Sequence, residues 1–170
     1  MSGRYLNTDA RISLLIMKQG NTEKKKDNTP RGVRNCNPGN IRLPKEENMM
    51  RDKFEGEIRP SRDKSFRTFA KMAYGYRAMH YLLRKYKNKY SLNTLEQMIY
   101  RWAPPSDNNK TEVYVDFVAK RAGIDRKDIV DVSNMTAMCR IVEAMAIMEC
   151  GGETGWVPDM NEVMDGWNLL

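Results

Sequence analysis

The chain has 170 residues and a mass of 19.8 kDa, with 41% hydrophobic residues, 30% charged residues and a mean hydropathy of −0.71. This size favours one domain with tails, because two complete hydrophobic cores would be cramped. The longest early apolar run, Leu14 to Met17 after Ile12, is far shorter than the roughly 20 residues of a membrane span and lacks a cleavage site. We therefore expect neither a membrane protein nor a signal peptide.

Cysteine and histidine are too few to support several common kinds of site. The chain has three cysteines, Cys36, Cys139 and Cys150, and one histidine, His80. An odd number of cysteines at unrelated spacings argues against a disulfide framework, and a zinc site needs about four ligands brought together. A Ser-His-Asp mechanism would have to use His80, which has no nucleophile signature around it. We expect no metal and no cofactor.

The net charge of +7 is distributed unevenly along the chain. Residues 1–34 carry 8 Lys/Arg and 3 Asp/Glu, residues 35–127 carry 20 and 11, and residues 128–170 carry 1 and 8. The basic character therefore belongs to the first two regions, opposite an acidic C-terminal part. A basic surface attracts nucleic acid, a membrane surface or an anionic polymer such as a cell wall, and charge alone does not choose among them.

The first 30 residues are expected to form a flexible basic leader, because residues 19–30 contain no apolar side chain and include Lys24 to Lys26. A single domain should then span residues 31–170. Residues 31–41 are rich in Gly, Asn and Pro, which predicts a sharply turned segment. Residues 54–69 have short apolar positions among charges and predict one irregular β-hairpin.

The rest of the chain is predicted to be helical. Apolar side chains recur at the spacing of one helix face in five segments, and Asn93 with Glu96 forms a predicted capping pair for the second. Pro104 ends the second helix, Gly123 the third and Gly151 the fourth, which should begin at Ser133. The apolar positions are Met79, Leu82, Leu83 and Tyr86; Leu95, Met98, Ile99 and Trp102; Val113, Tyr114, Phe117 and Val118; Met138, Ile141, Val142, Met145 and Met148; and Met160, Val163, Met164 and Trp167. The fold class is therefore mainly α with a small β-hairpin.

Glu149 is the most informative residue of the fourth helix. It lies within about 40° of the apolar stripe on the helical wheel, whereas Glu143 lies about 120° away and should face water. Burial, together with the negative end of the helix dipole, would raise the pKa of Glu149. A carboxyl group that stays protonated near neutral pH suits general-acid catalysis of glycoside cleavage. The alternative is that the helix end frays and Glu149 reaches water or pairs with an arginine.

Amide side chains in the predicted turn are candidates for substrate binding. Asn35, Asn37 and Asn40 could hold a sugar or the catalytic carboxyl group. Turn formation alone explains asparagine in such a segment, so both interpretations stay open.

Trp102, Tyr114 and Asn108 are further candidates for substrate binding. Trp102 and Tyr114 occur at helical spacing, which is typical of a core, and the loop from Pro104 to Asn109 between their helices, with Asn108, would form one wall of a cleft.

A second carboxylate would decide the reaction type. Glu57 is the preferred candidate, with Glu55 and Glu153 as alternatives, although charges on a hairpin are usually just solvated. Two-carboxylate hydrolases hold their carboxyl groups roughly 5–5.5 Å or 6.5–9.5 Å apart. No local sequence context holds any of these three residues in place. A mechanism that uses a single carboxyl group is therefore favoured.

Several motifs together resemble a family of phage and prophage proteins that are often labelled virion structural proteins. The resemblance covers residues 31 to about 125 and implies a lysozyme-like fold. The matching segments are Arg31 to Arg42, Phe54 to Gly56, Asp63 to Phe66, Phe69, Tyr74 to Ala78, and Arg101 to Asn109 with Tyr114.

A second resemblance connects residues 35–41, 54–56 and 66–69 and the following helix to flagellar-type glucosaminidases of the lysozyme superfamily. In those enzymes the catalytic Glu precedes the Asn-rich turn in an Ala-x-x-Glu-x-Gly setting. Here Ala146 to Gly151 resembles that setting, displaced toward the C-terminus, and Cys36 interrupts the paired asparagines. The resemblance therefore implies a circularly permuted lysozyme-like arrangement, in which the helix of Glu149 ends beside the turn.

These resemblances imply a phage or prophage enzyme that cleaves peptidoglycan between N-acetylmuramic acid and N-acetylglucosamine, with Glu149 as general acid. Such a protein would act on glycan strands from the virion, or from the host cytoplasm after release to the periplasm, and would contact other virion proteins. One alternative is a non-catalytic virion structural or glycan-binding protein with the same fold. The other is a basic nucleic-acid-binding module, for which the sequence offers no recognisable motif.

Overall fold

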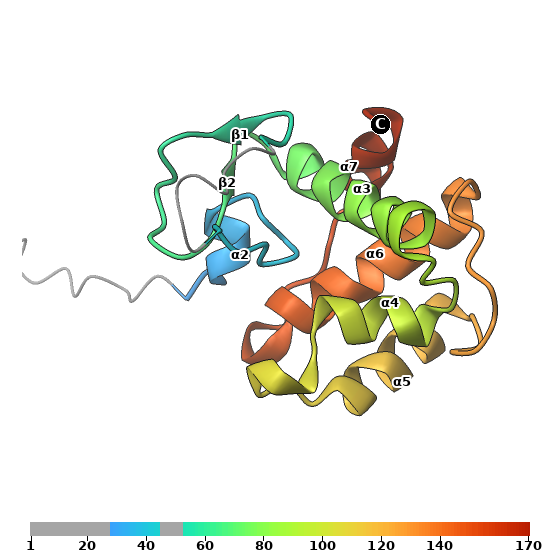
Figure 1. The fold of residues 1–170 in the computed structure, drawn as a ribbon. Coiled ribbons are helices and arrows are strands. Elements are labelled where there is room, and N and C mark those ends of the chain that lie inside the picture. Colours follow the sequence, from blue (N-terminus) through green and yellow to red (C-terminus); the bar gives the residue numbers. More distant parts are fainter. Residues whose placement is uncertain (1–27, 45–52) are drawn as a thin grey trace, which may run out of the picture.

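The computed structural model describes residues 28–44 and 53–170 (Figure 1). Residues 1–27, which make up most of the predicted leader, lie outside the described part of the chain. The described elements are the short helix α2 (Arg31–Arg34), strands β1 (Glu57–Ile58) and β2 (Thr68–Phe69), and helices α3 (Met72–Tyr90), α4 (Leu95–Trp102), α5 (Thr111–Ala122), α6 (Met135–Cys150) and α7 (Met160–Asn168), with 3₁₀ turns at Pro105–Asp107 and Gly152–Thr154. The predicted fold class, mainly α with a small hairpin, is confirmed.

Two helix starts differ slightly from the sequence-based expectation. Helix α4 is capped by Thr94 and Gln97, which exchange side-chain and backbone hydrogen bonds, rather than by Asn93 and Glu96. The Asn93 backbone N–H also donates to the Gln97 side chain, so Asn93 takes part in the cap through its backbone rather than through its side chain. Helix α6 begins after Asn134, whose side chain accepts from the Ala137 N–H.

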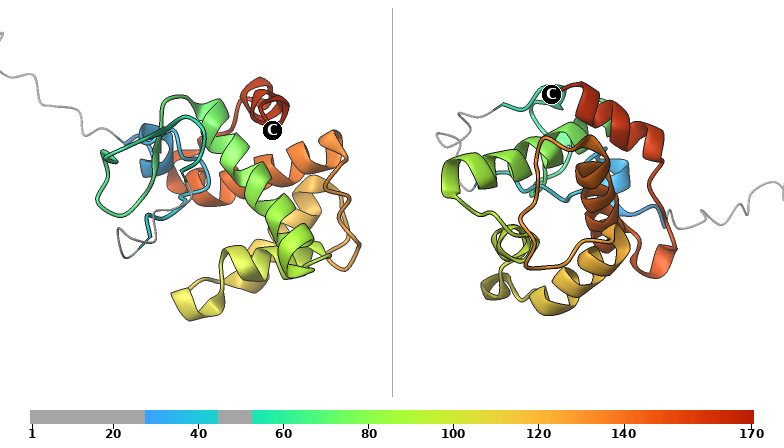
Figure 2. Two further views of the ribbon diagram at one scale, coloured as in Figure 1. Left: turned by 45° about the horizontal axis from the view of Figure 1, so that its top comes forward. Right: turned by 90° about the vertical axis from the view of Figure 1, so that its right-hand side faces the viewer.

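Helix α6 runs through the middle of the helical part, between α5 and α7, and its last turn reaches α2 (Figure 2). The core that it forms with α3, α4 and α5 is almost entirely apolar. Its fully buried members include Tyr76, Met79, Leu83, Leu95, Met98, Ile99, Val115, Val118, Met138, Ile141, Val142 and Met145. No helix among residues 28–44 and 53–170 is long and apolar enough to cross a membrane.

Glu143 corrects one expectation from the helical wheel. It was expected to face water, but only 9% of its surface is exposed. Its carboxylate accepts hydrogen bonds from Arg121 of α5 at 2.6 and 3.2 Å. Because neighbouring helices enclose α6 from several sides, a position well away from the apolar stripe is still covered, and an arginine neutralises it.

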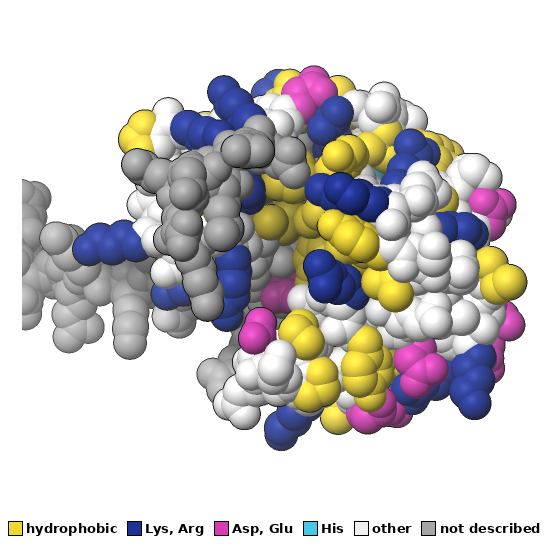
Figure 3. Space-filling model, viewed as in Figure 1, with side chains coloured by type: hydrophobic (Ala, Val, Ile, Leu, Met, Phe, Trp, Pro, Cys, Tyr) yellow, Lys and Arg dark blue, Asp and Glu magenta, His cyan; other side chains and the backbone are white. Residues whose placement is uncertain are grey.

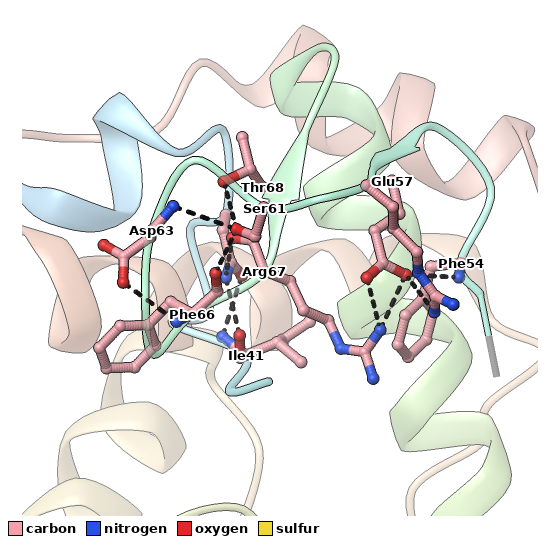
Figure 4. Close-up of polar contacts among 10 residues, drawn as sticks. Ile41, Phe54, Glu57, Ser61, Asp63, Phe66, Arg67 and Thr68 are labelled. Atoms are coloured by element: carbon pink, nitrogen blue, oxygen red, sulfur yellow. Dashed lines mark hydrogen bonds and ion pairs between the residues drawn. The ribbon is translucent and has the colours of Figure 1, made fainter. Parts of the chain in front are cut away.

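The hairpin part contains two strands of two residues each and is held by polar groups. Strands β1 and β2 pair antiparallel, with Glu57 opposite Phe69 and Ile58 opposite Thr68. Arg67 donates to both oxygens of the fully buried Glu57 carboxylate at 2.7 and 2.8 Å, and the Phe54 backbone N–H donates at 2.9 Å (Figure 4). Such short strands are marginal by themselves, so these buried bonds define the hairpin.

Residues 31–41, predicted as one sharply turned segment, begin with the short helix α2, and the turn itself, residues 35–41, packs closely on the helices. The Asn37 side chain is completely buried and bonds to both backbone groups of Ile41 and to the Arg67 carbonyl at 2.9–3.0 Å. A Cβ on Gly39 would lie 2.7 Å from Trp102 and 2.9 Å from Met79, which explains glycine there. The turn therefore lies directly against the ends of the helical part.

Candidate active site

Glu149 lies in the last turn of α6, where that helix meets the turn of residues 35–41. The Asn40 side-chain amide donates to Glu149 Oε2 and to the Glu149 carbonyl oxygen, both at 3.1 Å. Trp102 Nε1 and the Tyr114 hydroxyl each donate to Glu149 Oε1 at 3.0 Å. The predicted meeting of this helix end with the turn is therefore observed, across 109 positions of sequence.

Each donor is placed by a local feature of the sequence. Trp102 ends α4 because Pro104 and Pro105 cannot continue the helix. Tyr114 lies in the first turn of α5, and the Thr111 hydroxyl ties the start of that helix to the Ala103 carbonyl at 2.6 Å. Asn40 adopts a left-handed backbone conformation, with a φ of 45°, which asparagine tolerates better than most residues.

Burial raises the pKa of Glu149, and this desolvation outweighs the opposing effects of its neighbours. The hydrogen bonds from Trp102, Asn40 and Tyr114 and the positive charge of Arg42 all lower that pKa, because they stabilise the ionised form. Burial thus favours the protonated carboxyl group more than water would, while three neutral donors are placed to stabilise the carboxylate that proton transfer would leave.

Glu149 opens into a pocket of about 320 Å³ between the turn and the helices. Its wall combines apolar side chains with a few polar ones, which is the usual character of a ligand site. The lining residues are Gly39, Asn40, Ile41, Arg42, Phe66, Leu82, Tyr86, Trp102, Ala103, Asp107, Asn109 and Glu149. The space-filling view shows a hollow beside α3, walled by hydrophobic side chains with Lys and Arg side chains nearby (Figure 3).

Of the predicted substrate-binding residues, the structure brings Asn40, Trp102 and Tyr114 to Glu149 and places the other three elsewhere. Asn35 donates to Asp63 at 3.1 Å. Asn37 bonds within the turn and to the hairpin backbone, and Asn108 is an exposed residue with a φ of 61° between two residues that line the pocket.

Tyr114 and Trp102 combine the two interpretations that the sequence left open. Tyr114 is 6% exposed and belongs to the core, yet its hydroxyl bonds to Glu149. Trp102 packs against the core and also lines the pocket. Their rings pack while their polar atoms hold the carboxyl group.

Of the candidate second carboxylates, Glu57 and Glu55 do not line the pocket. Glu57 is enclosed in the hairpin by Arg67 and Arg59. Glu55 is exposed and pairs with Arg77 at 3.0 Å. The side chain of Glu153 lies outside what the structure describes. Asp107, in the loop between α4 and α5, is the acidic lining residue besides Glu149 in the described part of the chain.

The sequence analysis missed Arg42, Phe66, Leu82, Tyr86, Asp107 and Asn109 as residues of this pocket. Asp107 and Asn109 belong to the loop that was expected to form a cleft wall, so only the choice of Asn108 within it differs. Arg42 is the last residue of the Arg31 to Arg42 motif that carried the family resemblance, and its place in that motif was the sequence feature that could have indicated a role in the pocket. Leu82 and Tyr86 carried only the pattern of a core helix.

The described residues contain no group of three or more His, Cys, Asp or Glu side chains arranged to hold a metal ion.

No protein-family model matches the chain. Protein P5 of Pseudoalteromonas phage PM2 is 39% identical to it over 121 residues, which make up 71% of this chain and 71% of that protein. The chain belongs to the family of Protein P5, and its relative is a phage protein.

Proposed function

We propose that this protein is a phage enzyme that cleaves the glycan strands of peptidoglycan, with Glu149 as the general acid. The observation that carries the proposal is the setting of one carboxyl group: raised in pKa by burial, held by Asn40, Trp102 and Tyr114, and open to a pocket. A general acid needs a raised pKa and a stabilised conjugate base after transfer; burial acts in the first direction, and the three donors act in the second.

The proton transfer uses the two carboxyl oxygens differently. Oε1 accepts two hydrogen bonds, whereas Oε2 accepts one, from Asn40. A carboxylate offers about four acceptor sites, two on each oxygen. Oε2 can therefore accept from Asn40 and also carry the acidic proton, which it donates to an oxygen of the substrate. Glu149 protonates the glycosidic oxygen, and the bond from that oxygen to the anomeric carbon of N-acetylmuramic acid breaks.

A single carboxyl group then completes the reaction as a base. The Glu149 carboxylate takes the proton of the 6-hydroxyl of the same muramic acid residue, and that oxygen bonds to the anomeric carbon. The products are a shortened strand and a 1,6-anhydro end, as in lytic transglycosylases, and Glu149 regains its proton. The alternative within the same proposal is hydrolysis by a muramidase or glucosaminidase, for which a second carboxylate would direct a water molecule.

A circularly permuted lysozyme-like arrangement is part of the proposal. It is supported by the meeting of Glu149, near the C-terminal end of the chain, with Asn40, near the start of the described part. The catalytic helix and the Asn-rich turn would then occupy their usual mutual positions, although they occur in the opposite order along the chain.

Membership in a family of phage proteins supports a role during infection or lysis. The protein would reach the cell wall either as a virion component, in contact with other virion proteins, or by release from the host cytoplasm to the periplasm. Peptidoglycan is the proposed partner.

The test is digestion of purified peptidoglycan with mass analysis of the products. Glu149→Gln preserves the shape of the side chain and removes the proton, so we expect a loss of roughly 10²- to 10⁴-fold in rate. Glu55→Gln, an exposed carboxyl group outside the pocket, is the matched control and should keep full activity. Circular dichroism and thermal unfolding of both variants check folding. Undiminished activity of folded Glu149→Gln would overturn the assignment.

The same preparations distinguish the two alternatives. A non-catalytic glycan-binding protein would pellet with insoluble peptidoglycan and release no product. A nucleic-acid-binding module would bind DNA with an affinity that falls by orders of magnitude between low and physiological salt, as phosphate contacts require. We expect salt-tolerant binding to peptidoglycan and only weak, salt-sensitive binding to DNA.

A further inference from the structure

Arg42 occupies a defined position on the hairpin side of the pocket. Its backbone segment pairs with the hairpin: the Leu43 N–H donates to the Ser65 carbonyl at 2.9 Å, and the Arg67 N–H donates to the Ile41 carbonyl at 2.9 Å. Arg42 itself forms an isolated antiparallel bridge with Phe66. The backbone at Arg42 is thus held on both sides, while its side chain lines the pocket that contains Glu149.

Two arginines lie over the ring of Phe66, and only one of them is neutralised by a nearby carboxylate. The Arg31 guanidinium lies 5.2 Å from the ring centre and 3.7 Å from the Asp63 carboxylate. The Arg42 guanidinium lies 5.4 Å from the ring centre, and no carboxylate of residues 28–44 or 53–170 lies within 4.0 Å of it. Arg31 is not among the residues that line the pocket.

This difference bears on what the pocket binds. A guanidinium presents several donors in a planar fork that matches a carboxylate, and stacking on an aromatic ring holds that fork in place. Arg42 faces the pocket with this capacity available, and it is close enough to Glu149 to lower the pKa of that carboxyl group. A substrate with its own carboxylate near the scissile bond would place that carboxylate within the field of Arg42.

We infer that Arg42 recognises the carboxylate carried by the lactyl substituent of N-acetylmuramic acid, and so makes the pocket selective for acidic glycan strands over neutral ones such as chitin. This inference rests on the proposed function and adds the substrate feature that the site reads.

The experiment measures binding in the Glu149→Gln background, where turnover is expected to be slowed roughly 10²- to 10⁴-fold and residue 149 does not titrate. Three ligands of equal length are compared: a peptide-free strand of alternating N-acetylglucosamine and N-acetylmuramic acid, the same strand with its lactyl carboxylates converted to methylamides, and a chitin oligosaccharide. Arg42→Ala should weaken binding of the acidic strand roughly 10- to 100-fold, as for loss of a charge-assisted pair. Binding of the two neutral ligands should be unchanged.

Two further variants separate charge recognition from packing. Arg42→Lys keeps the charge and loses the planar fork, so it should fall between the parent and Arg42→Ala for the acidic strand alone. Arg31→Ala removes the other arginine from the Phe66 ring and should leave all three affinities unchanged. Equal losses for acidic and neutral strands, or no loss with Arg42→Ala, would overturn the inference.

The outcomes also distinguish this inference from the proposed function. If the wild-type protein cleaves strands but Arg42→Ala binds the acidic strand normally, only the role of Arg42 fails. If the acidic strand binds in an Arg42-dependent way and the wild-type protein releases no product, the catalytic proposal fails and the recognition stands. Absence of binding to all three ligands would overturn both.

Discussion

The hairpin part, residues 28–44 and 53–71, and the helical part, residues 72–170, are stabilised by different interactions. The helical part buries a large apolar core between α3, α4, α5, α6 and α7. The hairpin part has a small cluster around Phe54 and Phe69 and depends on a buried ion pair and on asparagine side chains that bond to the backbone. Packing thus organises one part, and directional polar bonds organise the other.

The candidate site lies where the two parts meet, and each part supplies a different set of side chains to it. The helical part contributes Glu149, Trp102 and Tyr114. The core holds the helices that carry all three residues, and it also packs against the rings of Trp102 and Tyr114. The hairpin part contributes Asn40 and Arg42, polar groups that a tightly bonded turn presents to the pocket. Unfolding of the helical part should therefore remove Glu149 and two of its donors, whereas unfolding of the hairpin part should remove Asn40 and Arg42 and leave Glu149 in place.

The largest expected effect on stability follows from breaking the buried pair of the hairpin. Glu57→Gln leaves the Arg67 guanidinium beside a neutral amide, and disruption of such a pair costs about 3–5 kcal/mol. Hydrogen exchange should show the loss first at residues 54–69, with α6 protected. Replacement of both Glu57 and Arg67 by methionine should cost less, because both members of the most buried pair are removed and only Arg59, which is partly exposed, and the Phe54 N–H lose this acceptor. Equal deprotection of α6 would show that the two parts unfold as one.

His80 makes the stability of the helical part sensitive to acid. It is completely buried between α3 and α7, where its Nε2 lies 3.2 Å from the Val163 carbonyl and its ring contacts Trp167. Burial lowers its pKa from 6.5 to about 4, with a smaller contribution from Arg84. Because the folded-state pKa is below the unfolded one, the stabilisation is present above about pH 6.5 and is lost progressively down to about pH 4.

The full effect of His80 amounts to about 3 kcal/mol, since each unit of pKa shift corresponds to about 1.4 kcal/mol. His80→Gln removes the titrating group and should flatten the dependence of stability on pH between 6.5 and 4. Urea unfolding of the two proteins across this range, followed by tryptophan fluorescence, measures the difference. Parallel curves for the parent and the variant would show that His80 does not control the acid response.

Periodicity located Glu149 in the sequence, whereas polar contacts were predicted only where a motif marked them, as at Asn40. The apolar stripe of α6 located Glu149, because core packing dictates which face of a helix is buried. The same reasoning was wrong for Glu143, since neighbouring helices and Arg121 enclose more of α6 than one stripe. Glu57 lies in a strand of only two residues and Arg42 in irregular backbone, so neither segment has a period that indicates direction. Only the folded hairpin shows that Glu57 is enclosed and that Arg42 lines the pocket.

The smallest expected effect concerns Asp107, the second acidic residue of the pocket wall. In a single-carboxyl transglycosylase Glu149 supplies both the acid and the base, so Asp107→Asn should leave the rate nearly unchanged. The products should remain anhydro-muropeptides, each one water molecule lighter than a hydrolysis product. Asn108→Ala, an exposed neighbour that does not line the pocket, is the matched control.

In a two-carboxylate hydrolase, by contrast, Asp107 would activate the attacking water or act as nucleophile, and its loss would lower the rate by roughly 10²- to 10⁴-fold. Reducing-end products together with inactivation by Asp107→Asn would therefore assign hydrolysis, with the base supplied by the loop between α4 and α5.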